Sequence, residues 1–225
     1  MNAQGKRSGE TAREYAYRMI REQVISLELK PGEAFNDMEF AAKIGVSRTP
    51  VREAVIQLSE ESRIIEIFPQ RGMRIAPIDV ELVEEARSLR VLLEKQIAGM
   101  CCEMATEEDI KWLQENVGLQ EFYMENSRAE MVMQLDDEMH HKLFMICHRE
   151  LTYGMCQKLA IHYDRIRSLS VNTVKDNTII EDHRKIIQFI AEHKKENAMA
   201  QMEKHLSRWQ LNEGKFRQEF PDYFK

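Results

Sequence analysis

Residues 36–58 read NDMEFAAKIGVSRTPVREAVIQL and decide the fold, because two short helical patterns meet there at a tight turn. The first pattern opens with Asn36 three residues before Glu39, the spacing of a helix N-cap and its acidic partner. The second opens at residues 47–50, Ser-Arg-Thr-Pro, where a hydroxyl can cap the helix and a proline fits its first turn. A turn at Gly45 joins the two patterns. The stretch therefore predicts a helix-turn-helix.

The second of these helices has two faces of opposite character. Its apolar residues recur at helical spacing and form a buried face: Val51, Ala54, Val55 and Leu58. Arg48 and Arg52, four residues apart, share another face, and Ser47 and Thr49 lie beside them. A guanidinium can donate two hydrogen bonds to guanine, and hydroxyls at a helix start suit phosphate, so we expect this face to contact a DNA major groove. The alternative is that this polar face is only solvated, as on an ordinary helical hairpin, and binds no DNA.

Residues 63–76, RIIEIFPQRGMRIA, follow with β character and predict a two-stranded hairpin with its turn at residues 69–72. A hairpin after a helix-turn-helix makes a winged helix, with Arg71 and Gly72 at the tip of the wing. An arginine there can enter a minor groove or pair with phosphate, and a glycine lets the backbone approach DNA closely. Any hairpin tip also tolerates an Arg-Gly pair without a function. The DNA-contacting role is favoured because the hairpin completes a winged helix.

Composition sets the class of protein. The chain has 225 residues, 43% hydrophobic and 31% charged, with nine glycines and five prolines, which favours a well-cored, mainly helical globular protein. It has no run of about 18 apolar residues and no apolar signal segment at its start, so we expect a cytoplasmic protein without a membrane span. The net charge is −6, but residues 1–77 hold 12 Lys and Arg against 11 Asp and Glu. The basic balance is local, as expected if one face of one domain meets phosphate.

The cysteines form neither a metal-type CxxC pair nor a disulfide framework, and we expect reduced thiols in the core. They are Cys101, Cys102, Cys147 and Cys156. A thiol sensor built on the adjacent Cys101 and Cys102 is an alternative. It is disfavoured because no basic neighbour accompanies that pair.

The fold class predicted is mainly α, a winged helix-turn-helix followed by an all-helical bundle. The expected parts are a disordered arm over 1–9, a winged helix-turn-helix domain over 10–76, a linker over 77–79 and a helical domain over 80–225. Six helices are expected in the second domain, over 80–104, 107–125, 129–148, 151–170, 177–193 and 196–217. Their short connections predict antiparallel neighbours. The aromatic-rich tail is expected to dock on the bundle or on a second subunit.

Four residues of the second domain have metal-ligand chemistry on inward faces. Asp136 and His140 are four apart and so project from one helical face, while His183 and His205 lie on the apolar stripes of two later helices. Three imidazoles and one carboxylate suit a borderline divalent ion, zinc before nickel or manganese. A single inward histidine is more often a hydrogen-bonded core residue. Four such groups buried together without a ligand would be costly, which favours the metal.

The run GVSRTPVREA at residues 45–54 resembles the most recognisable segment of the GntR family of bacterial transcription regulators, and the resemblance covers residues 10–76. It implies a winged helix that binds DNA. Met38 stands where some members have a contacting arginine, so that contact is expected to be absent. The positions that correspond to DNA contacts in the family are Ser47, Arg48, Thr49, Arg52 and Gly72.

Residues 80–217 resemble the all-helical FCD-type domain that follows the winged helix in the FadR-like subfamily. The patterns Arg90-x-x-Leu93-Glu94 and Asp136-x-x-Met139-His140 carry this resemblance. In the metal-binding branch of that subfamily the ion is held by the Asp and His of the second pattern and by two later histidines. The residues that fill these places are Asp136, His140, His183 and His205.

Together these features predict a homodimeric, metabolite-responsive repressor that binds a two-fold symmetric DNA operator and is not an enzyme. Four protein ligands leave about two positions open on a six-coordinate ion, where a small carboxylate or hydroxy-acid effector can bind, with Arg90 for its second charged group. Two alternatives remain. One is a metal-dependent enzyme whose open Asp/His₃ site activates water. The other is a regulator whose metal is purely structural.

Overall fold

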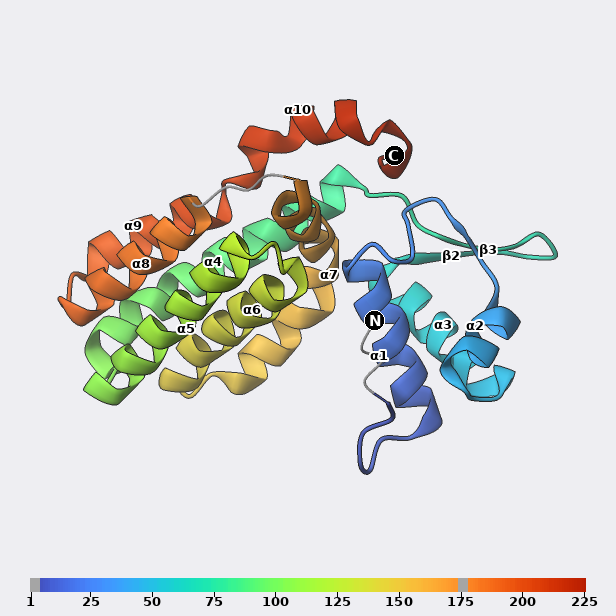
Figure 1. Ribbon diagram of the computed structural model, residues 1–225, viewed down its shortest axis with the longest axis horizontal. Coiled ribbons are helices and arrows are strands. Elements are labelled where there is room, and N and C mark those ends of the chain that lie inside the picture. Colours follow the sequence, from blue (N-terminus) through green and yellow to red (C-terminus); the bar gives the residue numbers. More distant parts are fainter. Residues whose placement is uncertain (1–4, 174–177) are drawn as a thin grey trace. The chain divides into compact units, whose positions relative to one another are not determined.

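The computed structural model describes residues 5–173 and 178–225 (Figure 1). Its contacts divide the chain into two compact units. Unit 1 comprises Met1–Val80 together with Phe220–Lys225, and unit 2 comprises Glu81–Glu219. The chain therefore passes from one unit to the other twice, once in each direction.

Unit 1 combines three helices with a small sheet. Its elements are α1 (Ala12–Ile25), β1 (Ala34–Phe35), α2 (Asp37–Ile44), α3 (Arg48–Ser62), β2 (Ile65–Phe68) and β3 (Gly72–Ile75). β3 lies between β1 and β2 and runs antiparallel to both. The predicted hairpin is β2–β3. The third strand, β1, was not predicted, because two residues are too few to show an alternating pattern.

The helix-turn-helix forms where the sequence predicts it. The Asn36 side chain accepts hydrogen bonds from the backbone N–H groups of Met38 and Glu39 and so caps α2. Gly45 ends that helix with a φ of 74°, a left-handed conformation that glycine adopts without steric cost. Ser47 is the N-cap residue of α3, but its hydroxyl makes no capping hydrogen bond, contrary to expectation. The apolar face of α3 is fully buried, as predicted: Val51, Ala54, Val55 and Leu58.

One residue of the hairpin, Gly72, lies in a strand and not in the predicted turn. Phe68 pairs with Gly72, which is the first residue of β3 rather than part of the turn. The turn is closed by the Arg71 N–H, which donates to the Phe68 carbonyl at 3.0 Å. Gly72 has a φ of 100°, which explains why a residue without a side chain is required where the chain re-enters the sheet. Arg71 therefore stays at the exposed tip, and Gly72 lies just behind it.

Unit 2 contains seven helices within the described residues. They are α4 (Val80–Met104), α5 (Glu107–Glu125), α6 (Ala129–Ile146), α7 (Glu150–Thr173), α8 (Thr178–Ala191), α9 (Lys195–Leu206) and α10 (Trp209–Glu219). Figure 1 shows α4, α5, α6, α8 and α9 running alongside one another. The core between them is apolar, with Leu113, Met139, Phe144, Ile186, Ala198 and Met202 among its members. The predicted capping box is present, since Thr106 and Asp109 bond reciprocally at the start of α5.

The last predicted helix, over 196–217, is two helices. α9 ends at Leu206, and α10 starts at Trp209 after a short break. At the break the Ser207 hydroxyl donates to the Glu203 carbonyl at 2.8 Å, which gives the backbone a side-chain partner and favours a bend. The expected start of the preceding helix at residue 177 lies outside the described residues.

The C-terminal tail packs in unit 1, whereas the sequence places it in a helical domain over 80–225. The Ile78 N–H donates to the Tyr223 carbonyl at 2.7 Å, and the Lys225 N–H donates to the Ile78 carbonyl at 3.0 Å. Ile78 and Phe224 thereby form an isolated parallel bridge. Ile78 is buried, so its backbone groups need partners, and the tail supplies them.

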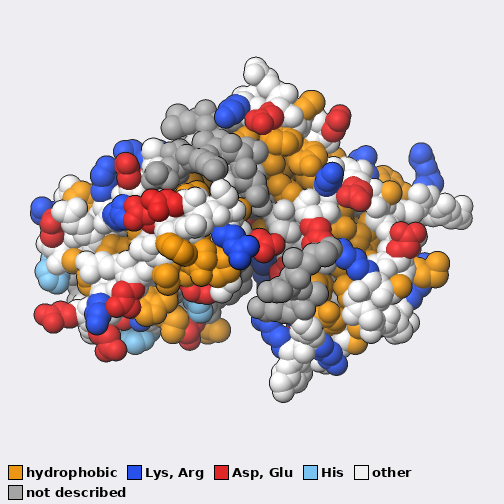
Figure 2. Space-filling view, viewed as in Figure 1, with side chains coloured by type: hydrophobic (Ala, Val, Ile, Leu, Met, Phe, Trp, Pro, Cys, Tyr) orange, Lys and Arg blue, Asp and Glu red, His pale blue; other side chains and the backbone are white. Residues whose placement is uncertain are grey.

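Charged side chains of both signs are spread over the face of the molecule in Figure 2. Within the described part of the chain, no helix combines the length and apolar character that crossing a bilayer requires.

Candidate functional site

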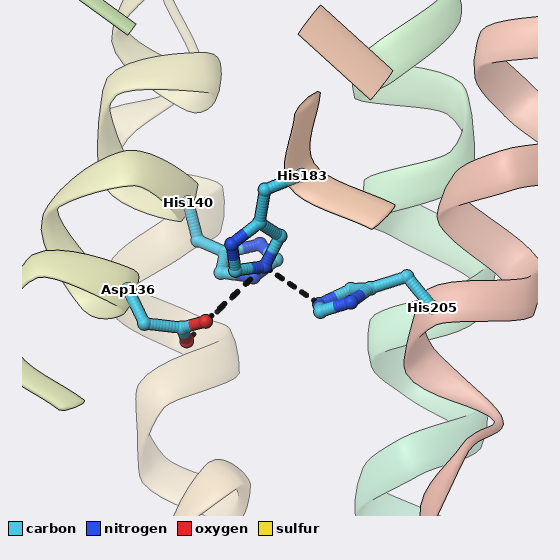
Figure 3. A group of neighbouring side chains, drawn as sticks. All are labelled: Asp136, His140, His183 and His205. Atoms are coloured by element: carbon cyan, nitrogen blue, oxygen red, sulfur yellow. Dashed lines mark hydrogen bonds and ion pairs between the residues drawn. The ribbon is translucent and has the colours of Figure 1, made fainter. Parts of the chain in front are cut away.

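The four predicted metal ligands converge in unit 2. α6 supplies Asp136 and His140 from one face, α8 supplies His183, and α9 supplies His205. Each of these residues offers one ligand atom, and the four atoms lie within 4.8 Å of one another. All four residues are buried. Figure 3 shows the carboxylate and the three imidazole rings pointing toward a common centre.

Two of the distances between these atoms are those of ligands on one ion, and the third is slightly longer. His183 Nε2 lies 3.2 Å from Asp136 Oδ1 and 3.3 Å from His205 Nε2. His140 Nε2 lies 3.8 Å from Asp136 Oδ2. Two ligands at about 2.1 Å from one metal, at tetrahedral or octahedral angles, are about 3.0–3.5 Å apart. The donor set and its spacing therefore fit a divalent ion of the zinc type.

A second layer of side chains holds two of the imidazoles in position. His183 Nδ1 lies 2.8 Å from Gln120 Oε1, and the Gln120 amide nitrogen donates to Asn116 Oδ1 at 2.7 Å. Because the amide nitrogen is engaged there, the oxygen faces His183 and receives its Nδ1 proton. His140 Nδ1 lies 2.5 Å from Glu94 Oε2. Both rings then direct an unprotonated Nε2 toward the centre, as metal ligation requires.

Arg167 on α7 sets the charge of the site. Its guanidinium contacts Asp136, lies 2.8 Å from Asp137 Oδ1 and 2.6 Å from Asp164 Oδ1. Burial opposes ionisation of Asp136, but Arg167 and the imidazoles outweigh it and hold the pKa of that carboxyl well below its usual range. The carboxylate is therefore available as an anionic ligand at neutral pH.

The imidazoles of His183 and His205 are neutral at physiological pH. Burial lowers the pKa of His183 to about 4, against the opposing attraction of Asp136. Burial, together with the neighbouring His183 and His140, places the pKa of His205 well below its ordinary value. Neutral imidazoles are the form that binds a metal, so the site needs no proton release from these two rings.

A small cavity adjoins this centre. It measures about 50 Å³, and Asp136 and His205 lie in its wall. The remaining wall combines cationic with apolar side chains: Arg90, Arg167, Arg208, Val132, Met133, Tyr163, Ile166, Ser170, Val171 and Ile179. Arg90, the residue expected for an effector, is one of them. Its Nε donates to Glu94 Oε1 at 2.6 Å, its guanidinium lies 5.2 Å from the Tyr163 ring, and its Nη1 has no hydrogen-bond partner among the described residues.

The sequence interpretation missed Arg167, Gln120 and the group around Asp182. Asp182 is fully buried, accepts from the Gln201 amide at 2.6 Å and contacts Arg208, which joins α8 to the end of α9. A signal existed for Gln120, because it stands on the apolar stripe of α5 with Leu113 and Val117. No comparable signal marks Arg167, because an arginine near other charged residues of α7, such as Asp164 and Arg165, is also what a solvent-exposed face would show.

The predicted DNA-contacting residues lie at two places in unit 1. Ser47, Arg48, Thr49 and Arg52 are exposed on the first turns of α3, and Arg71 and Gly72 are exposed at the wing. Arg48 is also tied to its own unit, because its Nε donates to Asp37 Oδ2 at 3.0 Å. Asp37 is 3% exposed, so this bond satisfies a buried carboxylate. Arg52 makes no hydrogen bond or ion pair with any described residue and is available to a partner.

The sequence matches two known families in tandem. Residues 12–75 match the family described as bacterial regulatory proteins, gntR family, and residues 85–208 match the FCD domain. The chain is 28% identical over 209 residues to the HTH-type transcriptional repressor RspR of Escherichia coli (strain K12), covering 92% of this chain and 91% of that protein. It is 26% identical over 185 residues to the Nta operon transcriptional regulator of Aminobacter aminovorans, covering 82% and 86%.

Solved structures share the fold over most of the chain. Escherichia coli McbR/YncC superposes with a TM-score of 0.78 at 17% identity, covering 93% of this chain and 99% of that one. A GntR regulator from Rhodococcus sp. RHA1 gives 0.72 at 16% identity, covering 89% and 96%. The two-domain architecture is therefore common to these proteins.

Proposed function

Because this chain belongs to the GntR family of bacterial regulatory proteins and carries an FCD domain, we propose that it is a homodimeric repressor whose operator affinity responds to a small carboxylate bound at a metal ion. As a family member it is a DNA-binding transcriptional regulator and not an enzyme. The metal, the effector, the dimer and the repression are what the proposal adds. The similarity to RspR, a repressor by name, supports the last of these.

One observation carries the proposal: four buried ligand atoms from three helices converge beside a cavity lined by arginines. Asp136, His140, His183 and His205 would hold the ion. The ion would supply open coordination positions to an oxygen ligand. A site meant only to hold the fold together would not need a cationic cavity next to its ligands.

The cavity limits the effector. The three arginines of the wall are each paired with a carboxylate of the protein, but Arg90 Nη1 is buried and has no hydrogen-bond partner among the described residues. This guanidinium nitrogen is the group that can accommodate a carboxylate of an effector. The cavity of about 50 Å³ has room for a few water molecules but is small for an organic acid. An organic acid with two or three carbon atoms therefore has to displace apolar side chains in the wall of the cavity. That displacement gives the effector a means of favouring one conformation of unit 2 over another.

On the DNA side, Arg52 is proposed to read a base and Arg48 to contact DNA while staying bonded to Asp37. Ser47 and Thr49 are proposed to contact phosphate, since the Ser47 hydroxyl is not used in capping α3. The wing residues Arg71 and Gly72 are proposed to approach the minor groove. In a two-fold dimer these surfaces would meet two half-sites of a symmetric operator.

The metal is tested with two adjacent histidines of α6. His140 points to the centre, whereas His141 stacks on Tyr153 with ring centroids 4.4 Å apart. We expect purified wild-type protein and His141→Ala to carry about one divalent ion per chain by elemental analysis, and His140→Ala to carry much less. Isothermal titration of chelated protein with zinc, nickel and manganese ranks the ions. Equal metal content in His140→Ala and His141→Ala would show that the metal is not bound at this site.

The effector is tested by gel-shift titration of an operator fragment with acetate, lactate, malate and citrate. Coupling between such sites typically changes affinity about 5- to 150-fold. We expect a carboxylate of this series to change operator affinity in wild type but not in Asp136→Ala. A variant that retains the full response makes the metal purely structural and places the effector elsewhere. A wild-type protein that ignores every carboxylate while still carrying metal leads to the same conclusion.

A further inference from the structure

Two of the four cysteines face each other in the core of unit 2. Cys101 on α4 and Cys147, the residue that ends α6, have their sulfur atoms 3.5 Å apart. Both are free thiols and both are buried. The adjacent Cys102 does not share this arrangement, because its sulfur lies 3.5 Å from the Ala98 carbonyl oxygen and 3.9 Å from that of Phe189 on α8. The pair that matters is distant in the sequence and not the vicinal one.

The pair has the geometry of a dithiol rather than of a metal site. Among the described residues, no third histidine, cysteine or carboxylate completes a metal-binding group with these two sulfurs. A disulfide bond is about 2.05 Å long, so closure requires the sulfurs to approach by about 1.5 Å. Rotation of two side chains can supply much of that approach, because each sulfur is held otherwise only by a backbone carbonyl. Cys101 Sγ lies 3.4 Å from the Leu143 oxygen, and Cys147 Sγ lies 3.6 Å from the Ile97 oxygen.

The two thiols are chemically unequal. The hydrogen bond from Cys101 and the nearby charge of Arg149 lower the pKa of the Cys147 thiol, against the opposing effect of burial. The same hydrogen bond and burial raise the pKa of Cys101. We assign Cys147 as the attacking sulfur and Cys101 as the resolving one, because Cys147 has Arg149 as a basic neighbour and its flanking residues Ile146 and His148 line a surface depression.

Cys147 lies close to the surface of unit 2. The residues on either side of it, Ile146 and His148, line a surface depression of about 820 Å³ together with Arg149. His148 has a φ of 54° in the left-handed cap that follows α6, where the His148 N–H donates to the Met145 carbonyl at 2.9 Å. Because Cys147 itself is buried, an oxidant can reach it only when this end of the helix opens locally.

We propose that Cys101 and Cys147 form a peroxide-oxidised dithiol that closes to a disulfide between α4 and α6. The Cys147 thiolate attacks one oxygen of hydrogen peroxide, the O–O bond breaks, and hydroxide leaves, which gives a sulfenic acid on Cys147. The Cys101 sulfur then attacks the sulfenic sulfur, the S–S bond forms, and the sulfenic oxygen leaves as water. Two thiols and one peroxide give one disulfide and two waters.

The disulfide would act on the helix pair that carries part of the metal centre. Glu94 precedes Cys101 by seven residues on α4, and His140 precedes Cys147 by seven on α6, which is about two helical turns in each case. Glu94 meets His140 at 2.5 Å, and the two sulfurs meet at 3.5 Å. The two contacts are thus equally spaced along two helices that run in the same direction. Drawing the sulfurs together shifts this interface, and we expect it to weaken metal binding by a few-fold or more.

The experiment exposes the purified full-length chain to graded hydrogen peroxide, followed by alkylation in denaturant and intact-mass analysis. We expect two of the four thiols per chain to become unavailable together, in a monomolecular product that dithiothreitol reverses. Tryptic mapping should link the peptide of residues 143–149, LFMICHR, to that of residues 96–111, QIAGMCCEMATEEDIK. The Cys102→Ser variant should give the same link, which identifies Cys101 as the partner.

Matched variants provide the controls. Cys156→Ser removes another buried thiol and should oxidise like wild type, whereas Cys101→Ser should instead accumulate a Cys147 sulfenic acid that dimedone labels. Four thiols that remain alkylatable, or a link through Cys102 or between chains, would overturn the proposal. These mass measurements on wild type do not depend on the folding of any variant. They also do not depend on the metal, so they stand or fall separately from the proposed function.

Discussion

The surface of α3 and the centre of unit 2 both rely on arginines and polar groups, but they hold charge in opposite ways. On α3, Arg52 is exposed and has no hydrogen bond or ion pair within the described chain, so its charge stays in water until a partner such as the proposed operator binds. In unit 2, the largely buried Arg167 pairs with the buried Asp136, and the two must satisfy each other as the protein folds. A binding surface can leave its charges in water, whereas an interior site has to neutralise them beforehand. Changes in the two regions should therefore register in different measurements.

The largest effect is expected at Arg167. Its replacement by alanine removes the guanidinium that contacts both Asp136 and Asp164, and removing one partner of a buried pair costs about 3–5 kcal/mol. Urea denaturation of Arg167→Ala should show a loss of that order in the free energy of unfolding. Arg184→Ala is the control, because Arg184 and its partner Glu121 are exposed and such pairs contribute about 0–1 kcal/mol. A similar decrease in the free energy of unfolding in both variants would contradict the difference expected between interior and surface charges.

Metal removal should come next. An ion that binds only the folded state at 100 to 1,000 times its dissociation constant stabilises by about 2.7–4.1 kcal/mol. We expect a chelator to lower the free energy of unfolding by that amount in wild type and to have no effect on His183→Ala. DNA-binding residues in unit 1 should be indifferent, so Arg52→Ala should respond to the chelator as wild type does. A chelator effect of the same size in His183→Ala would show that the ion is bound elsewhere.

Within α3 itself, the two arginines should behave differently. Arg52→Ala should weaken operator binding by about 1–3 kcal/mol if the side chain reads a base, with unfolding changed by less than about 0.5 kcal/mol. Arg48→Ala should weaken binding and also destabilise the fold, because it leaves Asp37 buried without its partner. Fluorescence anisotropy with specific and random DNA, beside urea denaturation, separates the effects. If Arg52→Ala weakens both DNAs equally, its contact is with phosphate.

The smallest effect is expected at Asp109, a charged residue on the surface of unit 2. Burial would raise its pKa, but hydrogen bonds from Lys142 and Thr106 outweigh it and lower the pKa to about 2. Because the folded-state pKa is below the unfolded value of about 3.9, the contribution is complete above about pH 5 and is lost as pH falls toward 2. Solvent screening keeps it under about 1 kcal/mol. Wild type and Asp109→Asn should therefore differ slightly in stability at pH 6 and converge near pH 2, and a difference that grows in acid would contradict this sign.

Much of the fold, and the inward position of the four candidate metal ligands, can be predicted from the sequence for a physical reason. Amphipathic helices repeat every 3.6 residues, so the spacing of Asp136 and His140 is enough to place them on one helical face. Helix caps such as Asn36 and Thr106 are local in the chain, and local hydrogen bonds can be inferred from short motifs.

The parts that could not be predicted depend on contacts between distant residues. Arg167 is 31 residues from Asp136, and the Gln120 amide is 63 residues from His183. Cys101 and Cys147 are 46 apart, and neither the spacing nor the neighbours of these cysteines distinguishes them from Cys102. The break at Ser207 arises from one side-chain hydrogen bond within a continuous helical pattern, which leaves the periodicity unchanged.

Unit 1 contains residues from both ends of the chain, so unit 2 is an insertion within unit 1. The bridge between Ile78 and Phe224 closes this inserted segment into a loop of roughly 140 residues. For a disordered loop of that length, bringing the ends together costs about 4 kcal/mol of chain entropy at room temperature. Folding of unit 2 removes most of that cost, because α4 and α10 then hold their ends in a defined geometry. The six C-terminal residues can therefore pack stably in unit 1 only when unit 2 is folded. A fragment that stops near residue 80 loses the partners of Ile78 and should melt lower than the same unit within the whole chain, and supplying the hexapeptide separately should restore little because nothing then confines it.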